Sequence, residues 1–192
     1  MALSHCNTTI ELREISLKNR PEELLLISPK GTVPVLKFHD NTILEESLDI
    51  MLWVLKKNNS SWLKSNIDTQ KNMIYINDND FKYYLDRYKY HDRYPEKSKN
   101  FYNSKCKEFL NHYEKRVSKS NFLLSDSIQF SDVAIFPFLR QYANVDKEDF
   151  FQSFPNLNNY LNVFYESELF LSVMNKYALW EKKSKPLITN FH

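Results

Sequence analysis

The stretch Gly31-Thr32-Val33-Pro34 constrains this 192-residue chain more than any other, because Gly31 is its only glycine. Pro34 opens an apolar run over residues 34–38, and proline is tolerated at the start of a strand since its missing N–H need not join the ladder. A glycine turn followed by X-Pro at a strand start is a place where a fold can hold a cis peptide bond. Val33–Pro34 is therefore the candidate cis bond.

The residues around this turn predict a mixed α/β region. Residues 9–15 alternate apolar and polar side chains, as a half-buried strand does. Pro21 with two following glutamates starts a helix that ends before Pro29, and Asp40-Asn41 forms a tight turn between strands at 34–38 and 42–44. From Ser47 to about residue 57, apolar residues fall on one helical face.

The rest of the chain predicts helices. Residues 56–61 are polar and aperiodic, which marks the boundary between domains, with Trp62-Leu63 as an anchor beside it. The sequence after Asp68 has no glycine and no strand alternation. The expected division is an N-terminal domain at 1–57, a linker at 58–66 and an all-helical domain at 67–192. The expected later helices lie near 97–117, 131–143, 157–165 and 169–176.

Charge, hydropathy and cysteine content exclude several classes of function. Twenty-six basic and 24 acidic residues give a net charge of +2, which offers no electrostatic argument for nucleic-acid binding. No apolar run approaches the ~20 residues needed to cross a bilayer. Cys6 and Cys106 lie too far apart for a disulfide framework or a metal motif, and the five histidines show no metal spacing. We expect a cytoplasmic protein without a metal.

The run Lys30–Leu36, followed by Glu45-Glu46-Ser47, resembles the glutathione-binding half of a glutathione S-transferase. Residues 130–143 resemble the core helix of that family's helical domain, and Phe154-Pro155-Asn156-Leu157 resembles its next helix. The resemblance is to the omega-like and bacterial members of the family. It implies a thioredoxin-like N-terminal domain and an all-α C-terminal domain. It also implies glutathione as substrate, a small electrophile or disulfide as second substrate, and a homodimer.

One departure concerns the start of the chain. Residues 1–5 resemble the end of the family's first helix, so the first strand and the catalytic position are expected to be missing. The strand at 9–15 would then lack its parallel partner. Either the native protein starts upstream, or this strand pairs in an unusual way, or the N-terminal half is poorly ordered. We assign no catalytic residue in this chain.

The resemblance implies a glutathione site. Val33, before Pro34, would pair its backbone with the cysteinyl unit in the manner of an added strand. Ser47 would cap a helix whose N-terminus receives the γ-glutamyl carboxylate, while Glu46 would hold the ammonium group. Arg20 would meet the glycine carboxylate, with Lys18 as its rival and Lys30 as a weaker candidate.

Other residues carry less specific signals. Tyr83, Arg87 and Tyr90 share a helical face and could line an acceptor pocket, although core packing is the ordinary role of such aromatics. Asp132 is expected to be structural, with Gln129 a poor helix cap and Ser131 the better one. The predicted function is glutathione transfer or glutathione-dependent thiol chemistry. The alternative is a non-catalytic scaffold with the same fold.

Overall fold

The computed structural model describes residues 1–191, which divide into two compact units. Unit 1 joins residues 1–60 to the segment that begins at Glu168, and unit 2 comprises residues 61–167. None of the helices in the described chain is long and apolar enough to span a bilayer.

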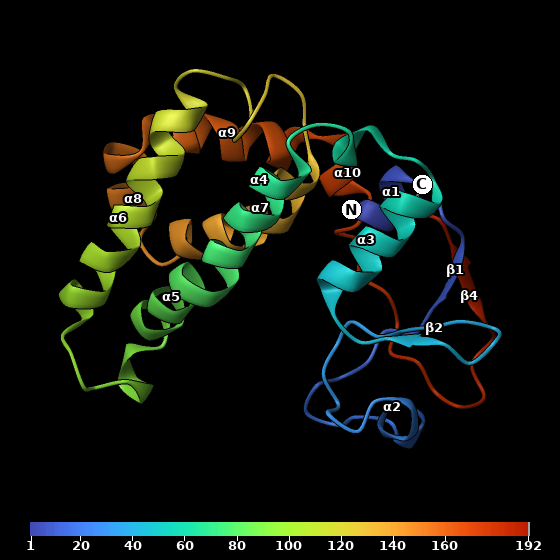
Figure 1. Cartoon of the computed structure of the whole chain (residues 1–192). Coiled ribbons are helices and arrows are strands. Elements are labelled where there is room, and N and C mark those ends of the chain that lie inside the picture. Colours follow the sequence, from blue (N-terminus) through green and yellow to red (C-terminus); the bar gives the residue numbers. More distant parts are fainter. Residues whose placement is uncertain (192) are drawn as a thin grey trace. The chain divides into compact units, whose positions relative to one another are not determined.

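Unit 1 is built from short helices and two pairs of strands (Figure 1). Its elements are α1 (Ala2–His5), β1 (Ile10–Leu12), α2 (Glu22–Ile27), β2 (Leu36–Lys37), β3 (Ile43–Leu44), α3 (Ser47–Lys57), α10 (Glu168–Leu171) and β4 (Leu187–Thr189). The hairpin expected at Asp40-Asn41 is confirmed, because β2 and β3 pair antiparallel with Leu36 opposite Leu44. Asn41 adopts a positive φ of 66°, and the Asp40 carboxylate accepts the Thr42 N–H at 2.9 Å.

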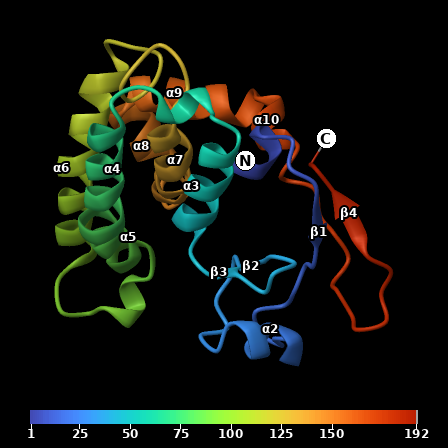
Figure 2. The same ribbon diagram turned by 45° about the vertical axis from the view of Figure 1, so that its right-hand side comes forward.

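The strand expected at 9–15 forms over Ile10–Leu12, and its partner is β4, from the other end of the chain. The two strands run antiparallel and side by side, with Ile10 opposite Thr189 (Figure 2). The Trp180 N–H continues the contact by donating to the Glu14 carbonyl oxygen at 2.7 Å. The expectation of helices throughout 67–192 is therefore wrong at 187–189. A three-residue run is too short to show strand periodicity, and only its partner makes it a strand.

Helix α3 supplies most of the buried apolar side chains of unit 1. Ile50, Val54 and Leu55 lie on its inner face, and none is more than 7% exposed. On another face, Trp53 packs edge-on against Phe38 at the end of the β2–β3 hairpin, with ring centroids 4.7 Å apart. The buried residues of α3 share one face, so α3 is the amphipathic helix that the sequence predicts. The contact between Trp53 and Phe38 holds the hairpin against α3.

Every regular element of unit 2 is a helix (Figure 1). Its elements are η1 (Ser61–Leu63), α4 (Ile67–Ile76), η2 (Asn77–Phe81), α5 (Lys82–Lys89), η3 (His91–Arg93), α6 (Lys99–Val117), α7 (Phe130–Ala143), α8 (Lys147–Ser153) and α9 (Pro155–Glu166). Segment η2 is a π-helical turn that joins α4 to α5 without a break. The helices expected near 97–117, 131–143 and 157–165 are confirmed within two residues, whereas the one near 169–176 ends at Leu171.

Helix α7 forms the centre of unit 2. Seven consecutive residues, 130–136, are buried, so every side of the N-terminal half of α7 is covered by the surrounding chain. Phe136 stacks on Phe164 of α9 with ring centroids 4.5 Å apart, and Tyr142 packs against Phe150 of α8 at 6.1 Å. Such aromatic pairs add to the apolar burial that holds the bundle together.

The buried carboxylate of Asp132 organises the start of α7. It accepts hydrogen bonds from the Gln129 N–H at 2.9 Å, the Leu123 N–H at 2.9 Å and the Tyr160 hydroxyl at 3.2 Å. The helix begins at Phe130, so Ser131 lies inside it and does not cap it, contrary to the expectation. The Ser131 backbone N–H instead donates to Gln70 at 2.9 Å. Asp132 is a structural residue, as predicted.

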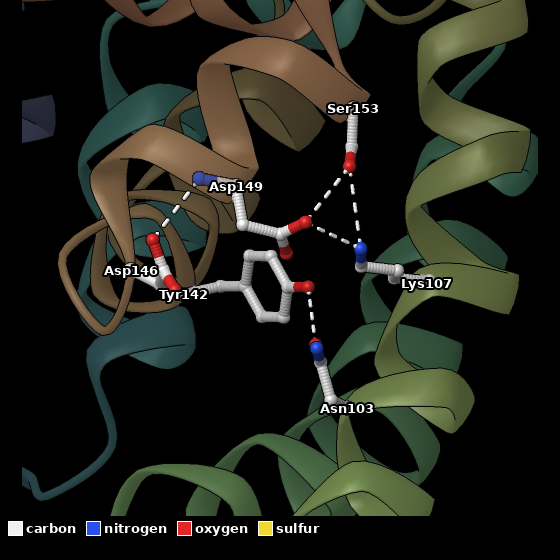
Figure 3. A network of polar contacts seen from close by, with 6 residues as sticks. All are labelled: Asn103, Lys107, Tyr142, Asp146, Asp149 and Ser153. Carbon is white, nitrogen blue, oxygen red and sulfur yellow. Dashed lines mark hydrogen bonds and ion pairs between the residues drawn. The ribbon is translucent and has the colours of Figure 1, made fainter.

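Helix α8 is attached to α6 by a small polar network (Figure 3). The Lys107 ammonium lies 2.7 Å from the Asp149 carboxylate and 3.2 Å from the Ser153 hydroxyl. Beside them, the Tyr142 hydroxyl donates to Asn103 at 2.6 Å. Lys107 lowers the pKa of Asp149, so this pair stays ionised and serves as a fastening between helices.

Candidate functional site

The Val33–Pro34 peptide bond is cis. Strand β2 begins two residues later, at Leu36, so Pro34 precedes the strand instead of opening it. Val33 precedes the ladder, so its backbone N–H and carbonyl take no part in the β2–β3 pairing. The residue is also 45% exposed. An extended ligand could pair with these groups in the manner of a strand.

Gly31 gives this loop its shape. Its φ of +61° lies in the left-handed region, and its N–H donates to the Ser28 carbonyl at 2.8 Å. The Arg20 side chain lies over it: a Cβ at Gly31 would come within 2.9 Å of Arg20 Cδ and 3.0 Å of Leu25 Cδ2. The absence of a side chain at Gly31 therefore lets Arg20 approach the loop that carries Val33.

Replacing Gly31 with alanine should lower the free energy of unfolding by about 1–3 kcal/mol, from a left-handed backbone that costs ~1–2 kcal/mol and from the clash with Arg20. Urea denaturation would measure the loss. Asparagine tolerates the left-handed region better than alanine does. The Gly31→Asn variant should therefore lose less unfolding free energy to backbone strain, while the clash with Arg20 remains. An alanine variant as stable as the parent would contradict this account.

The N-terminus of α3 lies at the end of the same unit's hairpin. Glu46 occupies the cap position with an extended backbone, and Ser47 is the first helical residue, so the expectation that Ser47 caps the helix is wrong. Neither side chain bonds the first turn, which leaves the early N–H groups of α3 and their partial positive charge available to an anion.

The two adjacent glutamates before α3 have different environments. Glu45 accepts a 2.6 Å hydrogen bond from the buried Ser28 hydroxyl. This bond joins the segment before α3 to the residue that follows α2. Glu46 is exposed and forms a 3.1 Å ion pair with Lys30, which raises the pKa of that lysine. The structure thus places Lys30, on the loop between α2 and Pro34, beside Glu46. It places Arg20, which precedes α2, beside Gly31 of the same loop. Lys18 is exposed in the turn before Arg20.

Neither cysteine suits nucleophilic chemistry. Cys6 donates to the Val54 carbonyl at 3.7 Å, and burial raises the pKa of its thiol. Cys106 is fully buried in α6, and burial raises its pKa to about 12. Since the thiolate is the reactive form, the raised pKa makes both thiols less reactive. No cluster of potential metal ligands occurs among residues 1–191.

The tyrosine-rich segment is only partly arranged as expected. The Arg87 guanidinium lies 3.4 Å from the ring centre of Tyr83 and 4.6 Å from that of Tyr94, so it stacks between the two. Tyr90 follows the last residue of α5 and contacts Lys89 and Arg93. The structure therefore joins Tyr83 to Arg87 but places Tyr90 in another contact. Sequence reasoning missed Tyr94, because it lies beyond the helix whose periodicity was used.

Two family models match the chain: "Glutathione S-transferase, N-terminal domain" over residues 1–62 and "Glutathione S-transferase, C-terminal domain" over residues 79–168. The chain belongs to the glutathione S-transferase family. This agrees with the fold described above, in which a small N-terminal unit with few strands is joined to a helical unit. No curated protein matches the chain.

Solved glutathione S-transferases share this fold. BphK, a bacterial enzyme solved as a ternary complex, aligns with a TM-score of 0.74 at 18% identity over 89% of this chain and 88% of its own. Glutathione transferase URE2P6 from Phanerochaete chrysosporium, solved with oxidized glutathione, aligns with a TM-score of 0.74 at 20% identity over 90% and 86%. A Pseudomonas fluorescens family member with two glutathione molecules bound gives 0.73 at 14% identity over 88% and 83%.

Proposed function

We propose that this glutathione S-transferase-family chain binds glutathione along Arg20, Val33, Pro34, Glu46 and Ser47. The observation that carries the proposal is the cis Val33–Pro34 bond, which leaves the backbone of exposed Val33 out of the ladder. That backbone would pair with the cysteinyl unit of the tripeptide. Two members of the family with the same fold support it: URE2P6 was solved with oxidized glutathione, and the Pseudomonas fluorescens protein with two glutathione molecules.

The charges around the loop suit the two ends of glutathione. The first N–H groups of α3, including that of Ser47, would receive the γ-glutamyl carboxylate, and Glu46 would receive the neighbouring ammonium. Glu46 is free to do so only if it exchanges Lys30 for the ligand, and this exchange is cheap because an exposed ion pair contributes ~0–1 kcal/mol. Arg20 would meet the glycine carboxylate at the other end.

Bound glutathione would be passed to a small electrophile or used in thiol–disulfide chemistry. We assign no residue of this chain to thiol activation, and burial raises the pKa of both Cys6 and Cys106. Tyr83, Arg87 and Tyr90 are the proposed acceptor residues, with Tyr94 added because it completes the stack on Arg87. A homodimer of omega-like or bacterial type and a cytoplasmic location complete the proposal. Two cysteines that form no disulfide suit a reducing compartment.

Calorimetric titration with glutathione tests the site. The parent chain should show saturable one-site binding, and Glu46→Gln should weaken it at least about tenfold, because a charge-assisted bond to the ammonium is lost. Glu45→Gln is the matched control, since Glu45 bonds Ser28 instead of facing solvent. Lys30→Gln should leave binding equal or stronger, because it frees Glu46.

Two further titrations separate binding from chemistry. S-methylglutathione should bind as well as glutathione, since no residue here is assigned to the thiol. The Pro34→Ala variant should bind both ligands more weakly than the parent chain. A folded parent chain that binds neither ligand would refute the proposal. So would Glu46→Gln and Pro34→Ala variants that bind like the parent.

A further inference from the structure

The C-terminal segment, residues 172–191, returns to the start of the chain within unit 1 (Figure 2). The Ser172 hydroxyl lies 3.0 Å from that of Ser4 in α1, and strand β4 pairs with the full length of β1. Beyond β4, the Asn190 side-chain amide donates to the side-chain oxygen of Asn7 at 2.7 Å. The C-terminal segment is therefore attached to the N-terminal chain on both sides of β4.

The same segment also contacts the chain beyond β1. The Trp180 N–H donates to the Glu14 carbonyl at 2.7 Å, and the Arg13 guanidinium lies over the Trp180 ring, 4.7 Å from its centre. Two residues later in the segment, the Lys182 ammonium lies 3.2 Å from the Glu23 carboxylate of α2. Neighbouring residues of the C-terminal segment thus contact both ends of the loop that joins β1 to α2.

Arg20, a residue of the proposed glutathione site, lies on that loop. A tight turn precedes it, in which the Asn19 N–H donates to the Ser16 carbonyl at 3.1 Å. The Arg20 side chain then extends over Gly31, and it forms no hydrogen bond or ion pair with any of residues 1–191. The position of its guanidinium therefore depends on the backbone of the loop that carries it.

The two contacts between the C-terminal segment and this loop differ in strength. The Lys182–Glu23 pair is exposed to solvent, and ion pairs of this kind contribute little. Trp180 combines a backbone hydrogen bond with a half-buried ring beneath a guanidinium, and both contacts hold the start of the loop. A loop that is held at its ends loses less conformational entropy when a residue on it binds a ligand.

We propose that Trp180 is a positioning residue for glutathione, because it holds the loop that presents Arg20 to the glycine carboxylate. The inference rests on the proposed function, which assigns Arg20 to that carboxylate. Its effect is selective for one end of the ligand. Val33 and Glu46 lie outside the loop, so the contacts proposed for the cysteinyl and γ-glutamyl units do not depend on Trp180.

Calorimetric titration with a matched pair of ligands tests this. Glutathione amide differs from glutathione only in its glycine end, where a neutral carboxamide replaces the carboxylate. The parent chain should bind glutathione at least about tenfold more tightly than the amide, because only glutathione gives Arg20 a charged partner. The Trp180→Ala variant should raise the Kd of glutathione at least about fivefold and change that of the amide less than about twofold.

Two further variants separate positioning from stability. Arg13→Gln removes the contact with the indole from the other side and leaves the C-terminal segment intact, so it should produce the same selective loss. In an Arg20→Gln background, Trp180→Ala should have no further effect on the Kd of glutathione, since the residue that it positions is gone. Far-UV circular dichroism of each variant establishes that it is folded.

Tyr177→Ala is the matched control. Tyr177 is a half-buried aromatic residue of the same segment and has no hydrogen bond or ring contact within the part of the chain that the structure describes, so this variant should bind both ligands like the parent. The inference is overturned if folded Trp180→Ala and Arg13→Gln variants weaken both ligands equally or neither. A parent chain that binds both ligands equally well overturns it too, while leaving glutathione binding in place. A parent that binds neither ligand refutes the proposed function itself.

Discussion

Replacing Asp132 with alanine is expected to lower the free energy of unfolding of unit 2 by about 3–5 kcal/mol. The change leaves the N–H groups of Leu123 and Gln129 buried without an acceptor, and each such group costs ~1–3 kcal/mol. It also removes the bond from the Tyr160 hydroxyl. Urea denaturation followed by far-UV circular dichroism would measure the loss.

Asp126 supplies the matched control for this prediction. Its carboxylate accepts an N–H from the same loop, that of Asn121 at 3.1 Å, but it lies in solvent. Asp126→Ala should therefore cost less than about 1 kcal/mol, since water replaces the lost acceptor. If the two alanine variants lost equal stability, the buried bonds of Asp132 would not be what holds the loop to α7.

The same residue predicts a dependence on pH. Burial raises the pKa of Asp132 to about 6 in the folded chain, above its ordinary value of 3.8. An acid whose pKa is raised by folding contributes most to stability below its unfolded pKa, and that contribution falls as the pH rises through the folded pKa. The stability advantage of the parent chain over Asp132→Asn should therefore shrink between about pH 4 and pH 6.5, by at most ~3 kcal/mol. A constant difference across this range would contradict the burial of an ionisable group here.

Replacing Glu114 with alanine is expected to cost about 2–3 kcal/mol. This carboxylate projects from α6 and caps the N-terminus of α9, where it accepts the N–H groups of Asn156 at 3.0 Å and Leu157 at 2.8 Å. It also accepts the side-chain amide of Asn156 at 2.7 Å. These bonds satisfy free donors of the first turn, and the negative charge interacts favourably with the helix dipole. Urea denaturation again provides the measurement.

Glu108, also on α6, gives the comparison for Glu114. It is exposed and paired only with Lys105, one turn earlier, so Glu108→Ala should cost no more than about 0.5 kcal/mol. High salt should weaken the Glu108 pair more than the partly buried Glu114 cap. Equal losses for the two variants would mean that α9 does not depend on a cap from α6.

Local pattern determined a large part of this structure. The only glycine, placed three residues before a proline, indicated the turn and the candidate cis bond at Val33–Pro34, and both the left-handed Gly31 and the cis bond are present. The Asp40-Asn41 turn and the helix that starts at Ser47 were also predicted, because turn chemistry and helical periodicity act over a few neighbouring residues. The family resemblance then added the two-part fold.

Only the tertiary structure decided the contacts between distant segments. The pairing of Ile10–Leu12 with Leu187–Thr189 and the cap that Glu114 supplies to α9 join residues far apart in the sequence. The stack of Tyr94 on Arg87 joins nearer residues, but it crosses the end of α5, where helical periodicity stops. Ser47 shows the same limit at short range, because its role depended on where the backbone of Glu46 leaves the extended region. Short-range preferences select the elements, but hydrogen-bond donors and apolar surfaces find distant partners only when the chain is packed.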